Sequence, residues 1–155
     1  MRRYLSGVIA GLLCLTAHSA ARADETSGKI VLGPPTDVVI EVGTGPEGEP
    51  TLADTEIPLA LGGYYRVNLV CPEAAAEAGG LHVEADELLA NSHLRVLSVG
   101  GMEFYVQGLT FRAIECDEAG TARFSFHPMR PGVYDLRVRD QSEPPREVVA
   151  SVIVE

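Results

Sequence analysis

The sequence predicts an all-β fold, a Greek-key β-sandwich or barrel with at most one or two short helical turns. Apolar residues return in runs of about five to eight, and several runs alternate with polar residues, as strands with one buried face do. Turns rich in Gly, Pro and acidic residues recur about every 8 to 12 residues, with no long amphipathic helix between them. This spacing favours an antiparallel sandwich over βαβ units.

The individual elements follow from the same patterns. In residues 65–70 the expected core face is Tyr65, Val67 and Leu69. Residues 43–50 are too rich in Gly and Pro to be anything but a loop. Short helices are expected within residues 72–78, which contain three consecutive alanines, and within 84–91, where Asp86 is the expected cap. Strands are expected at 38–42, 65–70, 102–106, 109–114, 122–126, 133–138 and 148–154.

The N-terminus has the three parts of a secretory signal peptide. Arg2 and Arg3 precede an apolar stretch from about residue 4 to 16, and Ala21 and Ala23 form a small-residue cleavage site. An apolar run of about 13 residues is shorter than the roughly 20 needed to span a bilayer. We therefore expect residues 1–23 to be removed on export to the periplasm without membrane insertion, leaving a lead at 24–35 and one domain at 36–155.

The mature chain is strongly acidic. Removal of residues 1–23 takes away three of the 12 basic residues and none of the 22 acidic ones, which leaves a net charge of −13. This balance disfavours a nucleic-acid partner, because binding to phosphates depends on Lys and Arg. Solubility is the simpler interpretation of the acidic residues, although a basic protein partner or a cation remains open.

Cys71 and Cys116 are the two cysteines that remain after signal cleavage. Export places them in an oxidising compartment, where disulfides persist, so we expect a bond between them. The alternative is that they are two unrelated buried cysteines, which behave as small apolar residues.

The C-terminal half resembles the cupredoxins, the exported Greek-key sandwiches of the plastocyanin and azurin type. In that family a Pro-Gly-x-Tyr turn leads into a strand that ends in the copper-binding cysteine, and a histidine and a methionine follow in the next loop. Here the turn is Pro131-Gly132-Val133-Tyr134. The matching residues are 115–126, 130–138 and the closing strand 151–155, and the resemblance is best from about residue 57 onward.

The resemblance implies a copper-type frame without its copper ligands. A blue-copper centre needs a thiolate, two imidazoles and usually a distant thioether. The cysteine position falls at Val138, the histidine position within 141–143 and the methionine position within 146–148, and none of these residues supplies the required sulfur or nitrogen. His82 lies near the position of the family's first histidine. The resemblance also places Cys71 and Cys116 at the end of the sandwich where copper would sit.

We therefore expect a non-enzymatic binding or interaction module with no cofactor, whose partner is an unidentified protein or small ligand. The alternative is a copper-handling protein, since imidazole and thioether ligands together suit the cuprous ion. No complete nucleophile-base motif is present, and Ser92 next to His93 has the wrong geometry for one. The candidate metal ligands are His82, His93, His127, Met102 and Met129.

Overall fold

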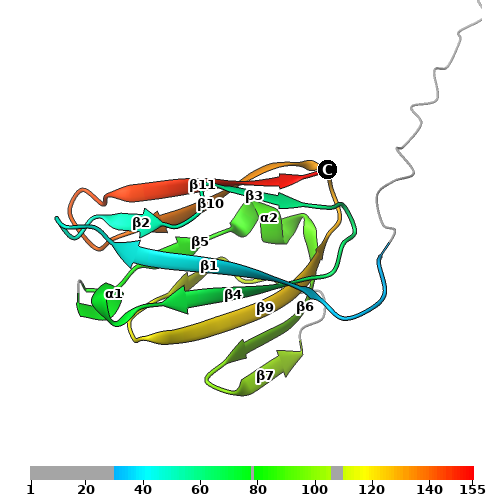
Figure 1. Cartoon of the computed structure of the whole chain (residues 1–155), viewed down its shortest axis with the longest axis horizontal. Coiled ribbons are helices and arrows are strands. Elements are labelled where there is room, and N and C mark those ends of the chain that lie inside the picture. Colours follow the sequence, from blue (N-terminus) through cyan, green and yellow to red (C-terminus); the bar gives the residue numbers. More distant parts are fainter. Residues whose placement is uncertain (1–29, 78, 106–109) are drawn as a thin grey trace, which may run out of the picture.

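The structure is a computed structural model that describes residues 30–77, 79–105 and 110–155, with the side chains of 102–105 not described. Two β-sheets pack face to face, as Figure 1 shows. The six-stranded sheet has the order β2-β1-β4-β9-β6-β7, with bounds β1 Thr36–Thr44, β2 Pro50–Leu52, β4 Tyr65–Cys71, β6 Ser92–Val99, β7 Met102–Tyr105 and β9 Gly120–Pro128. The five-stranded sheet has the order β3-β11-β10-β5-β8, with bounds β3 Glu56–Leu59, β5 His82–Glu84, β8 Ala113–Glu115, β10 Gly132–Arg139 and β11 Glu147–Val154.

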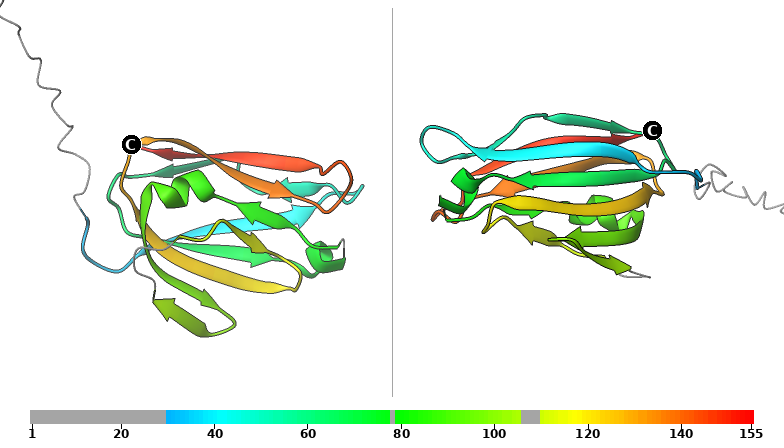
Figure 2. Two further views of the ribbon diagram at one scale, coloured as in Figure 1. Left: turned by 180° about the vertical axis from the view of Figure 1, so that it is seen from behind. Right: turned by 60° about the horizontal axis from the view of Figure 1, so that its bottom comes forward.

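Both sheets are mixed, which corrects the expectation of a purely antiparallel sandwich. The strand β1 runs parallel to β4, and β3 runs parallel to β11, while the other pairs are antiparallel. The parallel pairs arise because the chain changes sheets between β2 and β3 before it returns as β4. The strands β1, β4 and β9 lie side by side in the right-hand view of Figure 2.

The core lies between the inward faces of the two sheets. On β4 the expected core residues Val67 and Leu69 are buried, and Tyr65 is partly buried against the same core. The other strands contribute alternate residues to the core in the same way, because successive strand residues point to opposite faces. Further buried side chains are Phe124 and Phe126 on β9, Leu136 and Val138 on β10, and Val152 and Val154 on β11.

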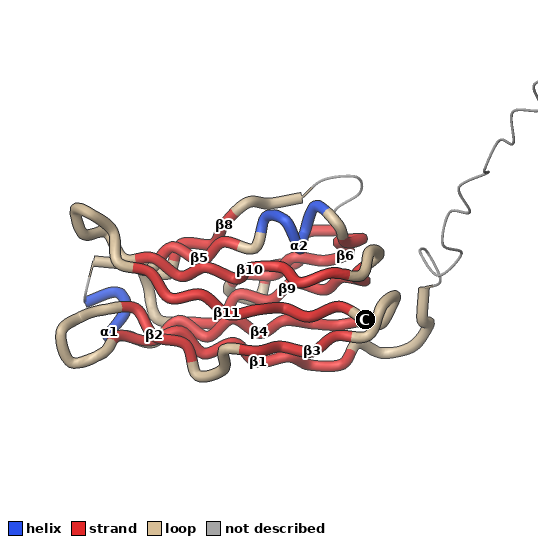
Figure 3. The backbone as a smooth tube through the Cα atoms, turned by 90° about the horizontal axis from the view of Figure 1, so that it is seen from above, coloured by secondary structure: helices blue, strands red, loops and turns tan. Residues whose placement is uncertain are grey.

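Two short helices are present, as expected. The first, α1, spans Glu73–Glu77 inside the expected range 72–78, whose last residue lies outside the described part. The second, α2, spans Asp86–Ala90, which is shorter than expected because Glu84 belongs to β5. Asp86 is not the cap, since Ala85 occupies that position without a side-chain hydrogen bond. Figure 3 shows how little of the described chain is helical.

Each predicted strand overlaps a strand of the structure, but the prediction at 109–114 holds only for its last two residues, which belong to β8. Thr110 to Arg112 is not a strand, although 109–114 was expected to be one and residue 109 lies outside the described part. Phe111 packs edge-on against Phe124 instead, with ring centroids 5.1 Å apart, so its apolar character reflects core packing in a loop. The loop predicted at 43–50 is shorter, because Thr44 ends β1 and Pro50 begins β2.

The prediction of a signal peptide at 1–23 lies outside the described residues, as does residue 106 of the predicted strand 102–106. Within the described residues, no helix has the length and apolar character to cross a membrane. Of the expected lead at 24–35, residues 30–35 are described, and the backbone N–H of Val31 donates to the carbonyl of Gly62.

Candidate functional site

The position that the resemblance gives to a copper-binding cysteine is filled by Val138, near the end of β10. Its side chain is fully buried, at 0 % exposure. On the two neighbouring strands it pairs with Val83 and Val148. An aliphatic side chain packed among strands in this way has no atom with which to bind a metal and contributes to the core instead.

His82, the candidate nearest to that position, is held between two carboxylates. Its Nδ1 lies 2.7 Å from Glu115 Oε2, and its Nε2 lies 3.2 Å from Glu84 Oε1. Gln141 donates to the other oxygen of Glu115 at 2.5 Å. A metal requires a bare nitrogen lone pair, and both ring nitrogens here face carboxylate oxygens, which accept hydrogen bonds. The geometry therefore makes His82 part of a hydrogen-bond network with Glu84 and Glu115.

Glu84 is the centre of this network. Its side chain is only 8 % exposed, and two arginines reach it: Arg112 Nη2 at 3.2 Å from Oε1, and Arg139 Nη2 at 3.2 Å from Oε2. Arg139 also contacts Glu147 at 3.2 Å. A buried carboxylate needs such partners, because an unpaired buried charge is strongly unfavourable. The end of the sandwich is thus occupied by charges that satisfy one another.

Polar side chains of the loop after β10 are also paired within the protein. Asp140 is buried, and one of its oxygens accepts hydrogen bonds from the Ser142 hydroxyl at 2.6 Å and from the Arg146 backbone N–H at 2.8 Å. The Arg146 guanidinium lies 2.6 Å from the other oxygen and also donates to the carbonyl of Glu47. These bonds, with that of the Ser142 hydroxyl first among them, hold the pKa of Asp140 well below its ordinary value. The loop is fixed by its own hydrogen bonds.

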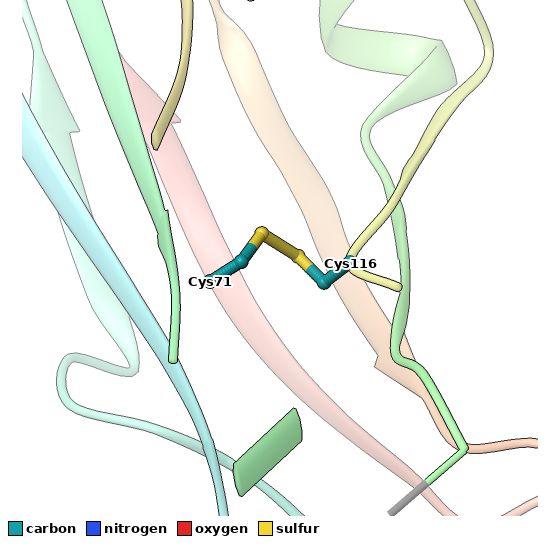
Figure 4. Close-up of a disulfide and its surroundings, with 2 residues drawn as sticks. All are labelled: Cys71 and Cys116. Atoms are coloured by element: carbon teal, nitrogen blue, oxygen red, sulfur yellow. A yellow bond between two sulfur atoms is a disulfide. The ribbon is translucent and has the colours of Figure 1, made fainter. Parts of the chain in front are cut away.

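A disulfide joins Cys71 to Cys116, which confirms the expected bond (Figure 4). Cys71 is the last residue of β4, and Cys116 follows β8, so the bond ties the two sheets together at the end that carries the His82 network. Both cysteines are buried. The strand β4 pairs with β9, and the register runs antiparallel from Tyr65 opposite Phe126 to Cys71 opposite Gly120.

His93 and His127 form a separate pair near the opposite end of the six-stranded sheet. They are directly opposite one another on β6 and β9, with ring centroids 6.4 Å apart. His127 is 1 % exposed; its Nδ1 bonds the Gly62 carbonyl at 3.2 Å, and its Nε2 is buried with no partner in the described structure. Burial, together with the nearby Arg95 and His93, lowers the pKa of His127. His127 is therefore built into the fold as a neutral ring.

Among the predicted metal ligands that the structure describes, His82 lies apart from the pair His93 and His127. His82 pairs with Arg139 at the end of β10, whereas His127 lies just before the turn that begins β10. Met129 follows β9, and its backbone N–H donates to Asn91. The side chain of Met102 lies outside the described part of the structure. Among the described residues, no group of three His, Cys, Asp or Glu side chains is arranged to hold a metal ion.

A groove of about 600 Å³ lies on the outer face of the six-stranded sheet. Its floor is a chain of hydrogen bonds between side chains from three neighbouring strands. Arg66 contacts Asp37 through two bonds of 2.6 Å, and Asn68 donates to the same carboxylate at 2.8 Å. The Arg123 Nε then donates to Asn68 Oδ1 at 2.9 Å. The floor is therefore preorganised by contacts within the protein.

The electrostatics of this floor are set by the arginines. The hydrogen bonds from Arg66 and then Asn68 lower the pKa of Asp37 to about 2, so its carboxylate stays ionised. The same contact raises the pKa of Arg66. Both side chains are roughly half exposed, at 44 % and 48 %, so the pair stays in contact with water. Asp37 is neutralised by Arg66, which leaves the charge of Arg123 uncompensated within this chain of bonds.

Tyr64 forms one wall of the groove. Its ring stacks on His127 with centroids 4.6 Å apart and an interplanar angle of 15°. Its hydroxyl donates to Ser125 Oγ at 3.3 Å. The Arg95 guanidinium lies over the Tyr64 ring, 5.7 Å from the ring centroid. Tyr64 thus forms the side of the groove nearest the histidine pair, and Arg95 lies against its ring.

Sequence reasoning did not identify this groove. The alternation in residues 65–70 correctly predicted that Arg66 and Asn68 point away from the core, and this is the only signal for the groove that the sequence offers. Asp37 and Arg123 lie 29 and 55 residues from their respective partners in the floor. Such contacts depend on strand register, which the sequence pattern does not specify.

Comparisons with known proteins give a likeness among solved structures and none among family models or curated proteins. No protein-family model matches this chain. No curated protein matches it either. Among solved structures, it is similar to auracyanin B, a cupredoxin, with a TM-score of 0.43 and 10 % sequence identity, over 83 % of this chain and 96 % of that chain.

Proposed function

We propose that this chain is an exported, cupredoxin-like binding module that has no blue-copper centre and catalyses no reaction. The observation that carries the proposal is the structure around Val138. A buried valine fills the cysteine position, and His82 beside it has both ring nitrogens within reach of carboxylate oxygens. A protein that used this end for electron transfer would need soft ligands there.

Binding is assigned instead to the groove on the six-stranded sheet. Polar side chains form its floor, and Val39 and Val96 add apolar surface. A volume of about 600 Å³ is within the range of small-molecule sites, roughly 300 to 1,000 Å³. The partner is a small ligand or a protein segment. Nucleic acid is disfavoured by the net charge of −13 that remains after removal of residues 1–23.

A periplasmic location is part of the proposal. The predicted signal peptide supports it, and so does the disulfide between Cys71 and Cys116, because such bonds persist in oxidising compartments. The test of location is the N-terminal sequence of the protein recovered from the periplasmic fraction, which we expect to begin at Asp24.

Metal analysis tests the absence of a copper centre. The mature protein, purified from the periplasm, should contain much less than one copper per chain and should develop no intense thiolate-to-Cu(II) absorption when Cu(II) is added. The disulfide variant with both cysteines replaced by alanine serves as a matched control, because its spectrum should be the same. Stoichiometric copper that survives dialysis against a chelator would overturn the proposal.

Copper handling by the histidine pair is the second candidate. It is favoured by one observation, the buried and unpartnered Nε2 of His127 with His93 directly opposite. Competition with a Cu(I) chelator distinguishes the two functions. If copper handling is correct, His127→Phe and His93→Ala will each weaken Cu(I) binding, while His82→Ala, at the other end of the sandwich, will not. If the binding-module function is correct, the wild-type protein will not compete with the chelator at all.

A further inference from the structure

We propose that the groove on the six-stranded sheet binds the carboxylate of a small organic anion, with Arg123 as the anchoring residue. The inference rests on the proposed binding function and adds the chemical class of the ligand. It is carried by the charge of the groove, by the way Arg123 is held, and by the other groups that face the ligand.

The groove carries an excess of positive charge, whereas the protein as a whole is acidic. The chain from residue 24 onward has nine basic and 22 acidic residues. Three of the nine, Arg66, Arg95 and Arg123, lie in or beside this one groove. Asp37 is the one carboxylate among its described lining residues, and Arg66 neutralises it through two hydrogen bonds. A local excess of positive charge on an acidic protein attracts an anion to this face.

Arg123 is positioned to receive that anion. Its Nε is already engaged with Asn68 Oδ1 at 2.9 Å, and Asn68 is itself held by Asp37. Among the described side chains, no carboxylate lies within ion-pair distance of Arg123, although its residue is exposed. The terminal nitrogens of a guanidinium form a planar fork that matches a carboxylate. The floor thus fixes the side chain and leaves its donors for the ligand.

The remaining groups determine what the ligand carries besides its carboxylate. Ser98 lies directly opposite Arg123 on the neighbouring strand β6, Ser125 lies two residues further along β9, and both residues line the groove. Their hydroxyls can bond hydroxyl or carbonyl groups of the ligand. Val39 and Val96 give the groove apolar surface for a carbon skeleton. A hydroxylated acid of the size of a single sugar acid satisfies both kinds of surface.

Two matched pairs of probes test the inference. D-Glucuronate and D-glucose differ in one carboxylate, and benzoate and benzyl alcohol differ in the same way but have an apolar body. Each is titrated into the ¹⁵N-labelled mature protein, and the Arg123 Nε–H signal and the backbone amides of Ser98 and Ser125 are followed. We expect saturable shifts with the acids, larger affinity for glucuronate than for benzoate, and no saturable shifts with either neutral partner.

A variant in the groove and a matched variant outside it test whether the anion binds in the groove. Arg123→Gln removes the fork and should weaken glucuronate binding roughly 10- to 100-fold, as loss of a hydrogen bond to a charged group does. Arg130→Gln removes the same charge from an exposed turn outside the groove and should leave binding unchanged. Retained melting temperature and a wild-type amide spectrum away from the groove show that each variant is folded.

The outcomes separate the inference from the function on which it rests. If glucose and benzyl alcohol shift the groove amides as strongly as the acids, the groove binds ligands but the anionic class is wrong. If Arg130→Gln weakens binding as much as Arg123→Gln, the effect is one of net charge and the inference fails. If none of the four probes shifts the groove amides, both the inference and the assignment of the binding site are refuted.

Discussion

The disulfide between Cys71 and Cys116 closes a loop of 45 residues, and its removal should have a measurable cost. In the chain-entropy description, a cross-link over a loop of this size destabilises the unfolded state by about 4 kcal/mol at 25 °C. Replacement of both cysteines by alanine should therefore lower the free energy of unfolding by about 3 to 4 kcal/mol. For a domain of this size, that corresponds to a decrease of roughly 10 to 20 °C in melting temperature.

Urea denaturation of the mature protein measures this effect. The wild-type protein in reducing agent serves as the control, and it should unfold at the same urea concentration as the double variant, while reductant should not affect the variant. Thiol titration of the denatured, unreduced wild type should find no free thiol. A double variant less than about 1 kcal/mol below the wild type would refute the reasoning, because loop closure would then contribute little to stability.

Two further predictions concern the core and the buried histidine. Leu136→Ala should destabilise the domain by about 2 to 5 kcal/mol in urea denaturation, because it opens a cavity at a side chain that is 3 % exposed. Val133→Ala on the same strand, at 66 % exposure, should change stability by less than about 0.5 kcal/mol. Equal effects would contradict the assignment of the two faces. The pKa of His127 is lowered in the folded state from 6.5, so the unfolded chain binds more protons below that pH and wild-type stability should fall as the pH decreases through 6.5. His127→Phe keeps an aromatic ring beside Tyr64 but cannot titrate, so its stability should vary less between pH 7 and pH 5, and an identical pH dependence in both proteins would show that another group is responsible.

The parts of the fold that depend on local alternation were predictable. Val67 and Leu69 were assigned to the core because polar residues separate them, and the structure buries both. The strand β6 was missed because its alternation is interrupted by an irregularity between Leu94 and Val96, which shifts the facing of the residues that follow. The strands β2, β3 and β5 have only three or four residues, too few for a periodic signal.

The candidate site was less predictable, because its contacts join distant parts of the chain. The disulfide could be expected because only two cysteines remain after residue 23, so that one pairing is available within the chain. His82 was expected to be a metal candidate, but its role depends on Glu115, which β8 brings beside β5. The floor of the groove likewise depends on the registers of β1, β4 and β9, and a shift of one residue would turn Arg66 into the core.

The position of β11 sets the order in which the molecule can be completed. Its residues, 147–154, are the last described strand in the sequence, yet β11 lies between β3 and β10 and pairs with both. Until those residues are available, β3 has no neighbour in its sheet, and much of the apolar surface between the sheets stays open to water. A chain that becomes available from its N-terminus onward therefore cannot close this interior until residues 147–154 have followed.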